Sequence, residues 1–162
     1  MKCIILTRPD GSVRVLHPAY NDLITGQRPG ENEDAYLSRV IARNQEAGQI
    51  HVAAVFKIVE AATLPTRDYR EAWSFDGTTV KHDMTVARQI KLDAEIRPER
   101  NKRLAALDID WSRAMAQGNT TLAGQIETKR QTLRDIPTTV TPSLDAITDP
   151  TALKTFTPSW PP

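Results

Sequence analysis

Residues that could do chemistry are few in this sequence, and their spacing matches no familiar catalytic or metal-binding motif. His17 precedes a proline, and His51 begins an apolar run. His82 directly precedes Asp83. Two histidines and Asp83 could ligate a metal, but no pair stands at helical or zinc-finger spacing. The sequence therefore predicts locally hydrogen-bonded or solvated histidines, with no metal and no cofactor.

Motifs for nucleophilic or phosphate chemistry are absent from the sequence. It contains no Gly-x-Ser-x-Gly, no Gly-rich phosphate loop and no His-Glu-x-x-His. Asp and Glu number 20, yet no pair stands out as a general acid and base. The sequence thus predicts a protein that is not an enzyme, and a small hydrolase is the lowest-ranked alternative.

The sequence contains one cysteine, Cys3, which lies in the apolar run 3–6. A lone cysteine excludes an intramolecular disulfide, and a free cysteine commonly behaves as a small hydrophobic residue. We expect Cys3 to be buried in a strand. A disulfide between chains is the alternative that an unpaired cysteine permits.

Composition narrows the class of protein further. The chain has 162 residues, and its net charge of 21 − 20 = +1 argues against a dedicated nucleic-acid binder. Hydrophobic residues make up 40% and aromatic residues 6%, which favours a modest core completed in part by another chain. Only four apolar residues follow Met1 and Lys2, and no stretch approaches the roughly 18 apolar residues of a membrane span. We therefore expect a soluble protein without a signal peptide.

One basic segment, residues 97–103, keeps a nucleic-acid-binding alternative open. Arg97, Arg100 and Arg103 could lie along a phosphate backbone if the segment is helical. Acidic residues are interleaved with them, and Glu99 stands four residues before Arg103. Ion pairs on a solvated helix face explain this pattern more simply.

The first half of the chain alternates strand and helix signals. Turn residues at 8–12 and at Asp76-Gly77 predict two antiparallel hairpins. Apolar spacing predicts a short helix, and a β-branched run predicts the clearest strand. The expected elements are a hairpin over 2–16, a helix over 33–44, a strand over 50–59 with Val52, Ala54, Phe56 and Ile58 on one face, and a weaker hairpin over 69–81. Residues 1–82 therefore read as a small mixed β/α domain.

The pattern becomes helical and charged from Asp83, which can cap a helix. Pro98 should kink this helix or split it in two. Gly118-Asn119 predicts a turn, with Thr120 or Thr121 capping a second helix that Ile136-Pro137 ends. Residues 83–136 should thus form a helical hairpin whose apolar residues are Leu104, Leu107, Trp111, Ala114 and Met115 on one helix and Leu122, Ile126 and Leu133 on the other.

Residues 137–162 hold six of the eleven prolines and read as an extended Pro-rich tail. A single-turn helix from Asp149 to Lys154 is expected within it. Trp160 has no local apolar partner, so it either anchors in a partner's pocket or docks back on its own domain. The predicted fold class is α+β.

Two helices alone leave part of their apolar surface in water, so the hairpin needs a third surface. The N-terminal β layer or another chain could supply it. The candidate partner-binding residues are Leu104, Leu107, Trp111, Leu133 and Trp160.

Several stretches resemble proteins of phage tails. Arg100-Asn101, Leu104, Asp108, Trp111, the segment 129–137 (Lys-Arg-Gln-Thr-Leu-Arg-Asp-Ile-Pro) and the terminal Trp160-Pro161 resemble the C-terminal part of phage tail assembly chaperones and tail-fibre-associated proteins. Residues 68–73, Asp76-Gly77, Asp83-Met84 and Ala87-Arg88 are similar to uncharacterised proteins of phage tail regions.

The resemblance implies a protein of the phage tail that binds a tail-fibre or baseplate protein, as a virion component or an assembly factor. Its expected location is the virion tail, or the host cytoplasm during assembly. A second copy of the chain is a further candidate partner. A membrane is not expected, and a nucleic-acid-binding accessory protein of a phage is the alternative function.

Overall fold

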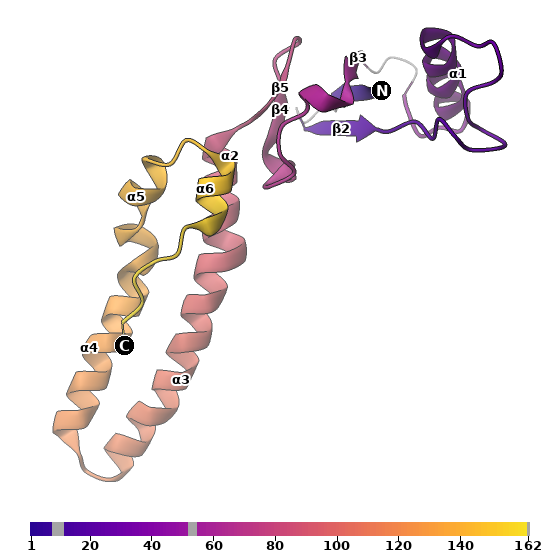
Figure 1. Cartoon of the computed structure of the whole chain (residues 1–162). Coiled ribbons are helices and arrows are strands. Elements are labelled where there is room, and N and C mark those ends of the chain that lie inside the picture. Colours follow the sequence, from indigo (N-terminus) through magenta and orange to yellow (C-terminus); the bar gives the residue numbers. More distant parts are fainter. Residues whose placement is uncertain (8–11, 52–54, 162) are drawn as a thin grey trace. The chain divides into compact units, whose positions relative to one another are not determined.

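The computed structural model describes residues 1–7, 12–51 and 55–161. The chain divides into two compact units, Met1–His82 (unit 1) and Asp83–Pro162 (unit 2). Helix accounts for 55% and strand for 14%, with small antiparallel sheets followed by a helical region (Figure 1). The predicted α+β class is confirmed.

Unit 1 is built on a three-stranded antiparallel sheet in the order β2 (Val13–Leu16), β1 (Lys2–Thr7), β3 (Phe56–Glu60). The hairpin predicted over 2–16 is confirmed by the antiparallel pairing of β1 with β2. Residues 8–11 of its predicted turn lie outside the described residues.

The central strand β1 buries side chains on both faces of the sheet. Successive strand residues point to opposite sides, so Cys3 and Ile5 face one layer and Ile4 and Leu6 face the other. All four are buried, which explains why the run is continuously apolar rather than alternating.

One face is covered by α1 (Glu33–Glu46), whose Leu37 and Ile41 pack with Ile4 and Leu6. Asn32 caps this helix, because its side chain accepts a hydrogen bond from the Ala35 amide. The helix predicted over 33–44 therefore forms and extends two residues further.

The other face is covered by a second antiparallel hairpin, β4 (Trp73–Phe75) with β5 (Val80–His82). Trp73 and Val80 pack against Cys3 and Ile5. The weaker hairpin predicted around Asp76-Gly77 is confirmed, although a 3-10 turn at Arg70–Ala72 replaces the start of its first strand.

The strand predicted over 50–59 is shorter than expected. Only Phe56–Glu60 forms β3, and the predicted positions Val52 and Ala54 lie outside the described residues. The Ile50 amide donates to the Asn44 carbonyl, so it completes the end of α1 instead of joining a strand ladder. Phe56, the first residue of β3, is exposed.

Unit 2 begins with continuous helical backbone: α2 (Met84–Lys91), a π-helical turn (Leu92–Ile96) and α3 (Arg97–Ala116). Proline lacks an amide hydrogen and clashes with the carbonyl four residues earlier. The π-helical turn ends at Ile96, two residues before Pro98, and contains Ala94, whose carbonyl the proline ring would otherwise meet. The predicted interruption is therefore this wider turn.

Helix α4 (Thr120–Thr139) follows a turn at Gly118, whose φ is +69°, and packs along α3. The predicted helical hairpin is present, but its cap is Asn119, which accepts the Leu122 amide at 3.0 Å. Pro137 does not end the helix as predicted. The helix continues past Pro137, because the Val140 amide donates a hydrogen bond to the Ile136 carbonyl. Ile136 itself is buried.

The predicted extended tail over 137–162 is wrong for most of its length. The end of α4, α5 (Thr141–Asp145) and α6 (Pro150–Thr155) are helical. The short helix predicted from Asp149 is confirmed as α6. The Asp149 carboxylate caps it by accepting a hydrogen bond from the Ala152 amide at 2.7 Å. Within the described ranges, no helix combines the length and apolarity needed to cross a membrane.

Candidate partner interface

The last residues of unit 2 return along its first helix. We call residues 147–161 the C-terminal strap (Figure 1). Arg88 donates from Nη2 to the Ile147 carbonyl at 2.8 Å, and Lys91 donates from Nζ to the Lys154 carbonyl at 3.0 Å. Leu153 is fully buried between these two anchors in the sequence. Two cations of α2 thus hold the strap by its backbone.

Lys91 is the one buried charged residue in the described part of the chain, with 3% of its surface exposed. Its Nζ also lies 2.5 Å from Glu95 Oε2. Burying an ammonium is costly unless it is paired and hydrogen-bonded. Lys91 meets that requirement through both a carboxylate and the strap carbonyl, so its burial depends on the strap being in place.

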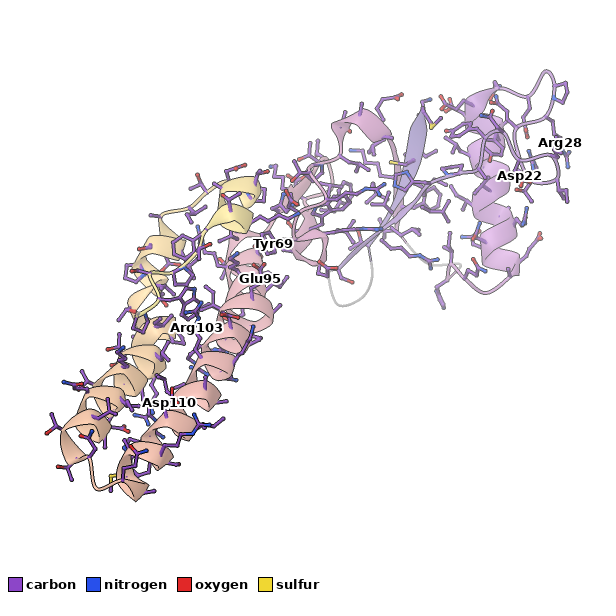
Figure 2. All side chains as sticks on the ribbon, turned by 60° about the horizontal axis from the view of Figure 1, so that its bottom comes forward. Asp22, Arg28, Tyr69, Glu95, Arg103 and Asp110 are labelled. Carbon is purple, nitrogen blue, oxygen red and sulfur yellow. The ribbon has the colours of Figure 1, made fainter. Side chains whose placement is uncertain are left out.

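Trp160 docks on its own unit. The Arg103 guanidinium carbon lies 4.8 Å from the centre of the Trp160 ring, and Arg103 Nε donates to Glu99 Oε1 at 2.8 Å. Figure 2 labels Arg103 on α3. A cation over an indole face contributes about 0.5–1 kcal/mol at an exposed site. Of the two predicted placements of Trp160, the structure therefore shows the intramolecular one.

The strap brings several of the predicted residues together. Pro161 borders a cavity of about 190 Å³ with Leu107 of α3 and Leu133 of α4. Leu104 is half-buried on the same helix as Leu107. The third surface that the apolar stripe required is thus supplied in part by the end of the chain itself.

Beyond the strap, the hairpin has a much thinner core. We call residues 108–128 the distal end. Its buried cluster consists of Ala114, Ala123 and Ile126, against which Trp111 is only partly buried. Two of these three residues are alanines, so little apolar surface is enclosed between the helices here.

Ion pairs and a cation–π contact link the two helices at the distal end. Arg130 lies 5.4 Å from the centre of the Trp111 ring, pairs with Asp108 at 2.7 Å and also pairs with Glu127. Arg134 donates to Glu127 at 2.8 Å. These hydrogen bonds and positive charges keep the pKa of Glu127 below its ordinary value.

Three large hydrophobic side chains of the distal end face solvent: Ile109, Met115 and Leu122. The prediction that Met115 and Leu122 lie on the apolar side of the hairpin is wrong. Ala114 and Ala123, their neighbours in sequence, occupy the helix contact instead. The distal end therefore exposes aliphatic and thioether groups on both of its helices.

The basic segment 97–103 is tied up within its own helix. Arg97 pairs with Asp93, and Arg103 pairs with Glu99. Arg100 donates from Nη2 to the Asn101 side chain at 2.9 Å. The carboxylates offset the charges of Arg97 and Arg103, whereas the Asn101 amide leaves the charge of Arg100 in place.

In unit 1, His82 is hydrogen-bonded, and burial shifts the pKa values of His17 and Cys3. His82 Nε2 lies 2.7 Å from the Asp68 carbonyl and 3.1 Å from Trp73 Nε1. Burial, together with Arg67 and Arg70, lowers the pKa of His17, while burial raises the pKa of the Cys3 thiol. Among the described residues, no three His, Cys, Asp or Glu side chains gather as a metal site.

Cys3 is a fully buried strand residue, as predicted. A disulfide between chains would require the β1 core to open, because no part of the residue reaches the surface. The structure therefore disfavours the interchain alternative.

Sequence reasoning missed Arg88 and Lys91, which hold the strap. Their contacts are with backbone carbonyls 59 and 63 residues away, and no side-chain pattern marks a carbonyl. The apolar residues Leu144 and Leu153 in the Pro-rich segment were the available signal, because both are buried. Comparison with known proteins adds no assignment: no family model, curated protein or solved structure matches this chain.

Proposed function

We propose that this chain is a non-enzymatic protein of a phage tail, which binds a tail-fibre or baseplate protein through the distal end of its helical hairpin. It acts in the virion tail, or in the host cytoplasm while the tail assembles. The resemblance of residues 100–137 to tail-associated proteins supports the class of partner. The exposed apolar surface of the distal end supports the place of contact.

This proposal rests on a difference between the two ends of the hairpin, because the strap covers only one of them. The strap lies over one part, whereas Ile109, Met115 and Leu122 remain exposed at the other. A helix pair with a thin core and exposed large hydrophobic groups gains most from packing against a further surface. Trp111, one of the predicted contact residues, stands four residues before Met115 on α3 and is only partly buried.

Co-purification tests the proposal. We expect the chain to co-purify with phage tails or with tail-fibre protein after gentle lysis, and to be detected by mass spectrometry in those fractions. The double variant Ile109→Asp with Met115→Asp should reduce recovery at least about tenfold, because two exposed apolar contacts worth roughly 1 kcal/mol each are lost.

Val86→Asp is the matched control, because Val86 is an exposed aliphatic residue of the same unit but lies on α2. It should bind like the wild type, and circular dichroism should show all variants to be folded. A free chain with no tail association, or a double variant that binds normally, would refute the proposed contact.

A further inference from the structure

Unit 1 carries the two most exposed large hydrophobic residues of the described chain. Leu23 has 102% and Ile24 has 93% of its surface exposed. They are neighbours at the tip of the loop between β2 and α1, and we call this pair the knob. Isolated exposed hydrophobic residues are common, but two adjacent, fully exposed aliphatic side chains form a small contact surface.

The loop holds the knob in a defined position. Asp22 Oδ1 accepts hydrogen bonds from the Ile24 amide at 3.0 Å, the Thr25 amide at 2.6 Å and Thr25 Oγ1 at 2.8 Å. A Cβ on Gly26 would lie 2.3 Å from the Asp22 carbonyl oxygen, so the turn closes too tightly for any other residue. Figure 2 labels Asp22 and Arg28 on this loop beside α1.

The base of the loop is fixed to α1. Arg39 donates to the Gly26 carbonyl at 2.8 Å and pairs with both carboxylate oxygens of Glu31, at 2.9 and 2.6 Å. The knob is therefore pre-organised, and binding through it would cost little ordering of the loop.

A pocket opens next to the knob. It has a volume of about 210 Å³ and lies between the end of β2, the loop and α1. Its lining is mixed: Leu16, Pro18 and Val40 supply the apolar part, and Thr25, Arg39 and Arg43 are among its polar residues. A cavity of roughly 150 Å³ accepts a benzene-sized group, so this pocket has room for one aliphatic side chain.

The charges around the knob and the pocket are complementary. All three hydrogen bonds to the Asp22 carboxylate end on Oδ1, so Oδ2 remains an acceptor. Hydrogen bonds from Thr25 and Ile24 lower the pKa of Asp22, and the charge of Arg43 adds a smaller contribution in the same direction. Arg28, Arg39 and Arg43 stand against Asp22 and Glu31 in this region, a net charge of 3 − 2 = +1. A patch that binds an anionic membrane surface instead gathers about 4–8 basic residues.

We propose that two copies of the chain pair symmetrically through unit 1, with the knob of each copy in the pocket of the other. A two-fold interface uses the same patch on both partners, so it requires a knob and a pocket side by side. Unit 1 meets that requirement. The same arrangement brings Asp22 Oδ2 toward the partner's Arg43, twice per dimer. This inference is independent of tail binding.

Measurement of mass in solution tests the pairing. Sedimentation or light scattering of the full chain at about 100 µM should give twice the chain mass of 18.1 kDa. Leu23→Asp should raise the dissociation constant at least about 100-fold, because each dimer loses two buried side chains and gains two buried charges. Ile109→Asp, an equivalent change in unit 2, should leave the dissociation constant unchanged.

Disulfide trapping tests the geometry. Two differently tagged chains, one with Leu23→Cys and the other with Val40→Cys, should form a mixed disulfide under mild oxidation. A mixture of Leu23→Cys with Val86→Cys should not, and the native Cys3 is buried. A monomeric wild type, a dimer insensitive to Leu23→Asp, or equal trapping in both mixtures would overturn the proposal.

Discussion

The two ends of the α3–α4 hairpin use the same helices but bury very different side chains. Where the strap lies, Ile96, Leu133, Ile136 and Leu153 are all buried. At the distal end the buried cluster consists of two alanines, Ala114 and Ala123, with one isoleucine. The covered end thus owes its core to a third layer, and the distal end has only two helices.

This difference shows what a helical hairpin lacks by itself. Two helices enclose one narrow seam, and any further apolar residue needs a surface from elsewhere. Residues far along the same chain provide that surface at one end. The distal end keeps its apolar groups exposed and is held by ion pairs, so it is the part of unit 2 best suited to contact a partner.

The largest expected effect compares two leucines of α4. Leu133→Ala should lower the free energy of unfolding of unit 2 by about 2–5 kcal/mol, because Leu133 is 1% exposed and its removal leaves a cavity. Leu122→Ala should cost less than about 1 kcal/mol, because Leu122 is 40% exposed. Urea unfolding followed by circular dichroism measures both values.

Equal losses of unfolding free energy for the two leucine variants would contradict the difference in packing between the two ends. They would mean that the distal end is packed in solution as tightly as the covered end. A second copy or another surface would then have to cover Leu122. Repeating the titration at several protein concentrations separates these cases, because only an intermolecular cover makes stability depend on concentration.

Local patterns in the sequence predicted most elements of the fold. The Asp76-Gly77 turn, the helix predicted over 33–44 and the apolar run of β1 each depend on neighbouring residues, and all three form. The errors arise where distant contacts override a local rule. Pro137 usually ends a helix, but the burial of Ile136 and the Val140 hydrogen bond carry α4 past it.

The candidate interface was predicted less completely, for the same reason. Periodicity identified Leu107 and Leu133 as a stripe in need of cover. It did not identify the cover, because Arg88 and Lys91 recognise backbone carbonyls of the strap and not side chains. The knob also escaped prediction, since nothing in the loop composition distinguishes Leu23 from a buried leucine.

A smaller effect is expected from the end of the strap. Trp160→Ala removes the ring beside Arg103, which should speed amide exchange in residues 156–161 by roughly 5- to 30-fold, equivalent to about 1–2 kcal/mol of local stability. Trp160→Phe keeps an aromatic face and should change exchange much less. Hydrogen-exchange mass spectrometry measures both variants.

The Trp160→Ala variant also tests whether Trp160 contacts only its own chain or a tail partner as well. Because the proposed tail contact lies at the distal end, Trp160→Ala should leave recovery with tails within about twofold of the wild type. A large loss of tail binding without a change in strap exchange would instead assign Trp160 a direct role at the partner, and would move the interface to the covered end.

The smallest effect concerns pH at the distal end. Hydrogen bonding to Arg134 and the nearby charge of Arg130 lower the pKa of Glu127 in the folded chain. A lowered carboxyl pKa stabilises the fold above the unfolded pKa, and this contribution is lost as the pH falls through the folded pKa.

Acidification from neutral pH to below the ordinary glutamate pKa should therefore speed exchange in residues 108–128, after correction for the intrinsic rate, more than in residues 92–106. The Glu127→Gln variant should have a less stable distal end at neutral pH, because its ion pairs with Arg130 and Arg134 are lost. It should also respond less to acid, because the titrating carboxyl is gone. If both stretches respond equally in the wild type, ion pairs do not distinguish the two ends, and the distal end must depend on apolar contacts as the covered end does.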